Sequence, residues 1–173
     1  MGRRINVIGV SGNGKTTVAR ALAERLGVPF VELDALHHGP NWSEPTIEEF
    51  RRRVEDATAG DAWVVDGNYR GKLGDYFFER ADTVVWLDQP LPLVLWRLWR
   101  RTFGRIRRQE LLWSDNRETW RGAFWGRESL FAWTIKKFVS DRRKLPARLA
   151  GHPHLRVVRL RTPREVKRFL EKI

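Results

Sequence analysis

Features that define several other protein classes are missing from this sequence. Its 173 residues include no cysteine, which excludes a disulfide framework, a thiol nucleophile and a zinc site built on cysteine. No apolar run approaches the roughly 18 residues that a membrane span needs. No charged-then-apolar leader precedes the first strand-like run at residues 5–8. We therefore expect a cytoplasmic protein without a membrane partner.

A phosphate-binding motif opens the chain. Residues 9–16 read GVSGNGKT, a complete G-x-x-x-x-G-K-[ST] loop between an apolar strand-like run and a helix-like run. In such a loop the backbone N–H groups around Gly12, Asn13 and Gly14 converge on phosphate oxygens, helped by the positive end of the helix dipole. Lys15 reaches the β- and γ-phosphates, and Thr16 offers its hydroxyl to Mg²⁺. The motif predicts binding of ATP or GTP together with Mg²⁺. Thr17, which follows the motif directly, is a further candidate for nucleotide binding.

A second magnesium ligand is expected at the end of another buried strand. The apolar run 63–65 leads to Asp66, although a carboxylate in this place is also common in plain turns. Gly67 follows it instead of a glutamate that could activate water, and no Asn-Lys-x-Asp guanine-specificity motif occurs in the chain. Transfer of phosphate from ATP to a bound acceptor therefore fits better than ATP hydrolysis or a GTPase.

Alternating strand-like and helix-like segments predict the α/β class. The strand-like runs lie near residues 4–9, 28–33, 61–66, 82–87 and 155–160. Their alternation with helices predicts a P-loop NTPase with a five-stranded parallel sheet and helices on both faces. The last helix opens with Thr-Pro-Arg-Glu at 162–165, a capping box with proline at the first helical position. We expect residues 1–173 to form a single domain.

The net charge of +12 is unevenly distributed along the chain. Residues 1–90 carry 11 basic and 14 acidic side chains, whereas residues 91–148 carry 15 basic and 5 acidic ones. A basic segment opposite a phosphate loop suits a lid that closes over phosphates, and it also suits a surface that binds polyanions. Compositional bias is a third explanation, because 26 of the 33 basic residues are arginine.

An insert at about 91–150 separates the fourth and fifth strands and holds six of the nine tryptophans. In its first helix Trp96, Trp99 and Phe103 fall at i, i+3 and i+7, which predicts the face that packs against the core. Three arginines lie in register on roughly the opposite face of this helix: Arg97, Arg101 and Arg105. We expect this helix to turn its arginines toward the phosphate loop.

Asp34 is predicted to end the second strand, on the edge of the sheet beside the phosphate loop. A carboxylate there can orient an acceptor hydroxyl, or take its proton as the bond to phosphorus forms. A helix cap is the plainer alternative. His37 and His38 could line the same pocket, but adjacent histidines point in different directions and no further metal ligand is apparent.

Taken together, these motifs resemble one family. The phosphate loop, the Leu-Asp-x-Leu-His run at 33–37, Trp42, and the runs 63–69 and 160–166 are similar to adenylate-kinase-related P-loop proteins, often labelled topology modulation proteins. More distantly, the chain resembles adenylate, shikimate and gluconate kinases. Asp34 matches the substrate aspartate of the latter two, and the segment from Asp66 to Arg70 is similar to the Asp-Gly-x-Pro-Arg of adenylate kinases, without its proline.

The resemblance implies a nucleotide-kinase-like fold with a helical, Arg-rich lid. Arg97 and Arg101, with Arg117 from the other side, correspond to lid arginines that stack on adenine or clamp the transferring phosphoryl group. Arg161 and Pro163 correspond to the loop that borders adenine. The residues implied on the acceptor side are Asp34, His37, Trp42, Asp66, Gly67 and Arg70.

The sequence thus predicts a phosphotransferase that depends on ATP and Mg²⁺ and acts on a small molecule or a nucleotide, as a monomer or a homodimer. The alternative is an ATP-binding, nucleic-acid-associated regulator of the DNA topology modulation type, which the basic segment and the family label favour. Against this alternative, no nucleic-acid-binding motif appears and many aromatic residues have core-like spacing.

Overall fold

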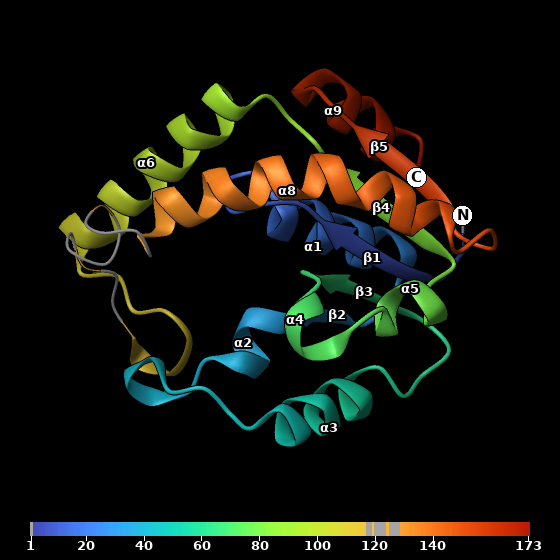
Figure 1. The fold of residues 1–173 in the computed structure, drawn as a ribbon, viewed down its shortest axis with the longest axis horizontal. Helices are drawn as coiled ribbons and strands as arrows, with labels where there is room; N and C mark the ends of the chain where they lie inside the picture. The colour runs from blue at the N-terminus through green and yellow to red at the C-terminus, as the bar shows by residue number, and fades with distance from the viewer. Residues whose placement is uncertain (1, 117–118, 120–123, 125–128) are drawn as a thin grey trace.

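The computed structural model describes residues 2–116, 119, 124 and 129–173 (Figure 1). Five strands form one parallel sheet in the order β2-β3-β1-β4-β5. The strands are β1 (Arg4–Ile8), β2 (Phe30–Glu32), β3 (Trp63–Asp66), β4 (Thr83–Leu87) and β5 (Arg156–Leu160). The predicted α/β class with a five-stranded parallel sheet is confirmed, and every strand boundary lies within two residues of its expected place.

The helices lie on both faces of this sheet. The α-helices are α1 (Lys15–Leu26), α2 (Leu33–His37), α3 (Ile47–Ala57), α4 (Arg70–Leu73), α5 (Tyr76–Arg80), α6 (Leu91–Arg108), α8 (Leu130–Ala150) and α9 (Pro163–Glu171). Two short 3-10 segments are η1 (Pro40–Trp42) and η2 (Trp113–Asp115). Among the described residues, no helix combines the length and the apolarity that crossing a bilayer requires.

Alternate residues of the central strands feed two separate apolar layers. Phe50 of α3, Phe77 of α5 and Leu145 of α8 pack on one face of the sheet. Leu22 of α1 and Phe169 of α9 pack on the other face. All residues of β3 and β4 are buried. Helices cover both faces of these strands, and strands in such a position are apolar almost throughout. This packing fixes the carboxyl ends of the strands, where the phosphate loop lies.

The predicted packing face of α6 is wrong. Its buried residues are Val94, Leu98, Thr102 and Ile106, whereas Trp96, Trp99 and Phe103 are 53%, 47% and 38% exposed. The reason is the close approach of α6 to the phosphate loop. A Cβ atom added to Gly12 would lie 2.5 Å from the carbonyl oxygen of Val94, so small side chains, not indole rings, fill this interface.

The Thr162 N-cap of α9 is confirmed, and the return bond of its capping box goes to the residue before the cap. The Thr162 hydroxyl accepts a hydrogen bond of 3.2 Å from the Glu165 N–H, and the Glu165 carboxylate accepts one of 2.7 Å from the Arg161 N–H. Pro163 occupies the first helical position, where its missing N–H costs nothing. The loop between β5 and α9 is therefore held close to the sheet edge.

Candidate active site

The phosphate loop uses one backbone donor internally, since the Asn13 N–H donates a hydrogen bond of 3.3 Å to the Val10 carbonyl oxygen. Gly9, Gly12 and Gly14 have φ angles of +151°, +85° and +84°, a region that side-chain-bearing residues rarely enter. Gly14 caps α1 without any side-chain hydrogen bond, and the first turn of α1 holds no acidic residue. The N–H groups at this helix start therefore point at a place suited to an anion.

Lys15 and Thr16 stand on either side of that place. The Lys15 ammonium lies 3.4 Å from the carbonyl oxygen of Val10, across the loop. The Thr16 hydroxyl donates a hydrogen bond of 2.6 Å to Oδ2 of Asp66, which ends β3 as the sequence predicts. The phosphate loop and the second acidic position thus meet at one sheet edge.

Asp66 has the donor atoms and the surroundings that a magnesium site needs. Its side chain is buried, and Oδ1 accepts no hydrogen bond from the described residues. Burial raises the pKa of this carboxyl, while the nearby Lys15 ammonium and the Thr16 hydroxyl oppose the rise. No three His, Asp or Glu side chains cluster into a metal site within the described part of the chain. A cation here would need oxygens from a bound phosphate as further ligands.

Asp34 lies in the first turn of α2, not at the end of β2, which stops at Glu32. The position still faces the cleft, because the short helix follows the strand directly. The Asp34 Oδ1 atom accepts a hydrogen bond of 2.7 Å from the Tyr69 hydroxyl. The negative charge of Asp34 contributes to the raised pKa of Asp66. Asp34, the candidate general base, therefore lies near the proposed magnesium side of the cleft.

His37 and Trp42 occupy different parts of the acceptor end. His37 is only 2% exposed, and its Nε2 atom lies 2.6 Å from the Lys72 ammonium. Trp42 is 39% exposed, and its backbone N–H donates a hydrogen bond of 2.8 Å to Oδ1 of Asn116. His37 therefore forms the buried wall of this end, and the segment around Trp42 joins the chain beyond α6.

The charge state of His37 gives a prediction for stability. Burial and the Lys72 ammonium lower the pKa of His37, so the unfolded chain binds a proton more readily than the folded chain. The free energy of unfolding should then fall as the pH drops from about 6.5 toward the lowered pKa. We expect His37→Gln to reduce this fall in urea titrations between these pH values. His154→Gln, a change at an exposed histidine, is the control, and equal pH dependence of all three proteins would contradict the interpretation.

Arg70 begins α4 and reaches across the cleft to α8. Its Nη2 atom donates a hydrogen bond of 2.8 Å to Oδ1 of Asp141, which also accepts one of 3.1 Å from Lys137. The Nε and Nη1 atoms of Arg70 are buried and have no hydrogen-bond partner among the described residues. Buried guanidinium donors are costly to leave unsatisfied, so Arg70 keeps hydrogen-bonding capacity for an anionic group.

The arginines of α6 face the cleft as predicted. Arg97, Arg101 and Arg105 all line it. Arg97 donates a hydrogen bond of 2.8 Å to the Gln89 side-chain oxygen, and the Gln89 N–H donates one of 3.3 Å to Oδ1 of Asn13. The lid helix is thereby tied to the phosphate loop through Gln89. Arg117 lies outside the described residues.

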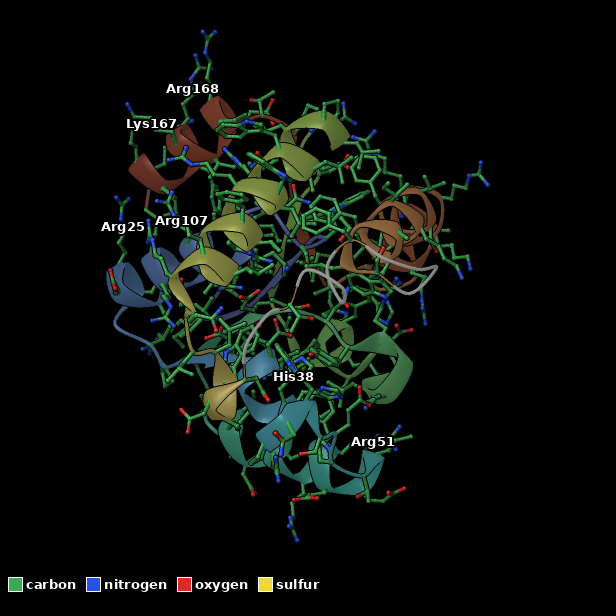
Figure 2. The ribbon with its side chains drawn as sticks, turned by 90° about the vertical axis from the view of Figure 1, so that its left-hand side faces the viewer. Arg25, His38, Arg51, Arg107, Lys167 and Arg168 are labelled. Carbon is green, nitrogen blue, oxygen red and sulfur yellow. The ribbon has the colours of Figure 1, made fainter. Side chains whose placement is uncertain are left out.

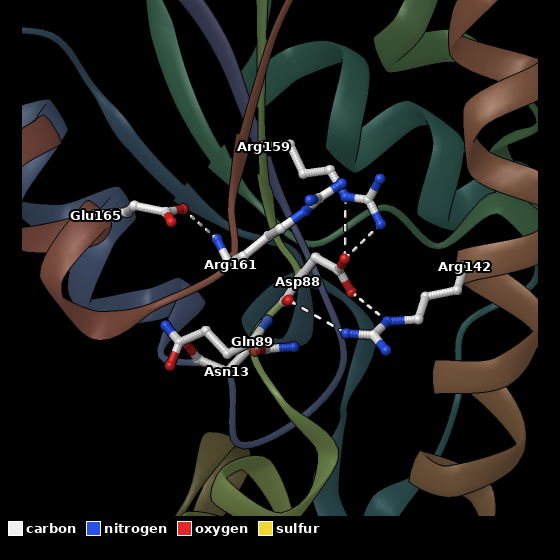
Figure 3. Close-up of polar contacts among 7 residues, drawn as sticks. All are labelled: Asn13, Asp88, Gln89, Arg142, Arg159, Arg161 and Glu165. Carbon is white, nitrogen blue, oxygen red and sulfur yellow. Dashed lines mark hydrogen bonds and ion pairs between the residues drawn. The ribbon is translucent and has the colours of Figure 1, made fainter.

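The end of β4 anchors this connection. Asp88 is 3% exposed and accepts hydrogen bonds from Arg142 of α8 and Arg159 of β5, at 2.7 Å and 2.6 Å (Figure 3). Figure 3 shows Asn13 and Gln89 beside this cluster. Asp88 is thus held by α8 and by β5, and the next residue, Gln89, follows directly from this anchor. Of the two predicted adenine-loop residues, Pro163 lines the cleft, whereas Arg161 does not and contributes its backbone N–H to the cap of α9.

One cleft of about 2060 Å³ joins all these parts. It runs from α9 past the phosphate loop to the segment that carries His38 and Trp42, and Thr17, Asp66 and Gly67 also line it. In Figure 2 His38 lies toward the middle of the molecule, whereas Arg51, Lys167 and Arg168 lie at its periphery. A cleft of this size accommodates a nucleotide and a second small molecule at once.

Sequence reasoning misses three residues of this site. Gln89 and Tyr69 follow β4 and β3, and their place at the carboxyl edge of a parallel sheet is a signal that could have found them. Asp141 has no such signal, because it lies within α8 and is 71 residues from its partner Arg70. Only the tertiary fold brings these two together.

Known proteins share the fold and the motifs of this chain. Residues 5–88 match the family described as ATPase family associated with various cellular activities (AAA). The shikimate kinase of Ruegeria pomeroyi is 31% identical over 159 residues, which cover 80% of this chain and 76% of that protein. The chain belongs to the P-loop kinases related to shikimate kinases. This P-loop kinase is also 31% identical to the cytidylate kinase of Methanobrevibacter smithii, over 56% of the chain and 63% of the relative.

A solved structure supports the fold assignment. The shikimate kinase from Acinetobacter baumannii, determined with shikimate, superposes with a TM-score of 0.56 at 20% identity. The superposition covers 99% of this P-loop kinase and 90% of that protein. The relatives are kinases of small molecules or nucleotides, so the prediction of an ATP-dependent phosphotransferase is confirmed. They give no support to the nucleic-acid-associated regulator.

Proposed function

We propose that this kinase transfers the γ-phosphate of Mg²⁺-ATP to a hydroxyl group of a small acceptor that carries a negative charge. The observation that carries the proposal is the pair of unsatisfied guanidinium nitrogens of Arg70, a residue that lines the cleft together with Asp34. Asp34 suits a hydroxyl, and Arg70 suits a carboxylate or a phosphate. The acceptor would thus be held at both ends.

At the nucleotide end, the residues of the phosphate loop would bind the ATP phosphates. The N–H groups of Gly12, Gly14, Lys15 and Thr16 and the Lys15 ammonium suit the β- and γ-phosphates. Thr16 and Asp66 would hold Mg²⁺ together with phosphate oxygens, consistent with the unsatisfied Oδ1 atom of Asp66. The bound ion would offset phosphate charge.

Arg97 and Arg101 would stabilise the transferring group from the lid side. Both line the cleft, and the guanidinium of Arg97 is already held by Gln89 next to the phosphate loop. Preorganised guanidinium groups placed where charge develops stabilise the transition state without reorganisation during the step. Arg117 is proposed for the same role.

At the acceptor end, the hydroxyl oxygen of the acceptor would bond to the γ-phosphorus of ATP while the bond from that phosphorus to ADP breaks. Asp34 would take the proton of this hydroxyl group. Trp42 and the Gly67 backbone would border the bound molecule, since both line the cleft. The names of the relatives put shikimate and gluconate among the hydroxyl acceptors to be tried.

A transfer screen with matched acceptor pairs tests the proposal. Each pair sets an anionic compound with free hydroxyl groups against a neutral one of similar shape: shikimate against its methyl ester, and gluconate against glucitol. Labelled γ-phosphate from ATP should appear only on anionic members, and the Lys15→Ala protein serves as the blank. Preferred labelling of neutral members would overturn the proposed acceptor class.

Replacing Arg70 tests the anion site directly. We expect Arg70→Gln to raise the KM for the acceptor by about 10–100-fold, the usual value of a hydrogen bond to a charged group. The KM for ATP should stay within about twofold, because Arg70 binds at the other end of the cleft. Steady-state kinetics with each substrate varied in turn measures both constants.

Two further variants serve as controls for Arg70. Arg70→Lys keeps the charge but loses the planar pair of donors, so it should fall between the wild type and Arg70→Gln. Arg143→Gln removes an exposed arginine of α8 that does not line the cleft, and it should change neither KM. An unaltered acceptor KM in Arg70→Gln would remove Arg70 from the acceptor site.

A further inference from the structure

We propose that Tyr69 is a positioning residue, whose hydroxyl fixes one oxygen of Asp34 so that the other oxygen faces the acceptor. The inference rests on the proposed function, in which Asp34 receives the proton of the acceptor hydroxyl. The Tyr69 hydroxyl donates a hydrogen bond of 2.7 Å to Oδ1 of Asp34. Among the described residues, Oδ2 of Asp34 accepts no such bond.

The backbone of Tyr69 has an unusual conformation. Its φ and ψ angles are +34° and +39°, in the left-handed region, and it stands directly before α4. A bulky aromatic residue rarely adopts this strained conformation, and such residues are concentrated at functional sites. The conformation sends the ring toward α2 and the next residue, Arg70, toward α8. One strained turn therefore serves both ends of the proposed acceptor site.

Neighbouring rings hold the Tyr69 side chain in place. Its ring centroid lies 4.5 Å from that of His37 and 5.1 Å from that of Phe50, and Phe50 is fully buried. Burial is the main cause that raises the pKa of Tyr69 far above its usual value, and the Asp34 carboxylate raises it further. The hydroxyl thus keeps its proton and remains a donor to Asp34.

A second contact links Tyr69 to the segment beyond α6. The Nε2 atom of His38 lies 3.4 Å from the Tyr69 hydroxyl oxygen. The ring of Trp113 lies 5.7 Å from the ring of His38, and the Ser114 hydroxyl donates a hydrogen bond of 2.9 Å to the His38 carbonyl. The η2 segment therefore holds His38, and through the contact of His38 with Tyr69 it also supports the orientation of Asp34.

A double-mutant cycle with Asp34 separates positioning from a general structural role. With the acceptor found in the transfer screen, Tyr69→Phe should lower kcat by about 10-fold or more, the usual effect of losing a hydrogen bond to a charged group. The KM for ATP and the melting temperature should change little. In the Asp34→Asn background the same substitution should lower kcat less than about twofold, because the two residues act as one unit. Tyr76→Phe is the matched control, since Tyr76 is the other of the two tyrosines and contacts Thr58 outside the cleft.

The outcomes distinguish the two proposals. Equal losses from Tyr69→Phe with and without Asp34, or no loss at all, would overturn the positioning role. Unchanged turnover in Asp34→Asn would instead overturn the proposed role of Asp34. If Asp34→Asn turns over too slowly to measure, calorimetric acceptor affinities complete the cycle.

A second readout needs no acceptor. In Tyr76→Phe protein, Tyr69 is the one remaining tyrosine, so phenolate absorbance reports its ionisation. The proposal expects this absorbance to rise at lower pH when Asp34→Asn is added, because the negative charge of the carboxylate no longer opposes ionisation. The same onset with and without Asp34 would contradict the contact on which the proposal depends.

Discussion

Replacing Lys15 with alanine is expected to lower kcat by about 10²–10³-fold, the usual loss when one preorganised donor to developing charge is removed. The Lys15 ammonium stands at the start of α1, opposite the Val10 carbonyl, where the γ-phosphate would lie. Its charge should matter more in the transition state than in the bound substrate. Transfer kinetics at saturating ATP and acceptor measure this loss.

Lys172→Ala is the matched control for Lys15, because Lys172 is exposed and does not line the cleft. Circular dichroism should show that both variants keep the fold, since Lys15 is not part of either apolar layer. A Lys15→Ala protein with nearly wild-type turnover would mean that the phosphate loop does not carry the reaction.

Replacing Asp34 with asparagine is expected to lower kcat by about 10²–10⁴-fold, the range that general base catalysis contributes. Asparagine keeps the shape and accepts the Tyr69 hydrogen bond but cannot take a proton. ATP affinity should be retained, because Asp34 makes no described contact with the phosphate loop. Turnover and ATP binding, measured by calorimetry on the same protein, separate the two effects.

Asp56→Asn, at an exposed position of α3, controls for the loss of one negative charge. It should leave both turnover and ATP affinity unchanged. Equal losses of ATP affinity and turnover in Asp34→Asn would assign Asp34 a structural role. Full turnover in this variant would place the proton acceptor elsewhere.

Local sequence signals are sufficient for the nucleotide end of the site. The glycines, Lys15 and Thr16 lie within one short loop, and Asp66 ends an apolar strand whose place in a parallel sheet follows from the alternation of elements. The contact of 2.6 Å between Thr16 and Asp66 is the geometric result. Here spacing along the chain and proximity in space agree.

The acceptor end depends on contacts that spacing does not encode. The bond between Arg70 and Asp141 joins α4 to α8, and Asn116 bonds the backbone of Trp42 from 74 residues away. The same applies to α6, whose helical period predicts two faces but not which one packs. Close approach of Val94 to Gly12 decides that question in favour of the smaller side chains.

The position of Asp34 shows a smaller error of the same kind. The apolar run predicts a strand to residue 33, but β2 ends at Glu32 and α2 begins at Leu33. Strand and helix meet without a loop here, so propensity alone cannot place the boundary. Asp34 nevertheless lies beside the phosphate loop in the shared cleft.

The fate of the γ-phosphate tests the central claim most directly. Wild-type protein is given γ-labelled ATP and Mg²⁺ with and without an anionic acceptor, and the label on the acceptor and in inorganic phosphate is separated and counted. We predict that the label leaves ATP mainly when the acceptor is present, and that it is recovered on the acceptor's hydroxyl. Label found in inorganic phosphate alone, at a rate that no acceptor changes, would contradict the assignment of this cleft to phosphate transfer.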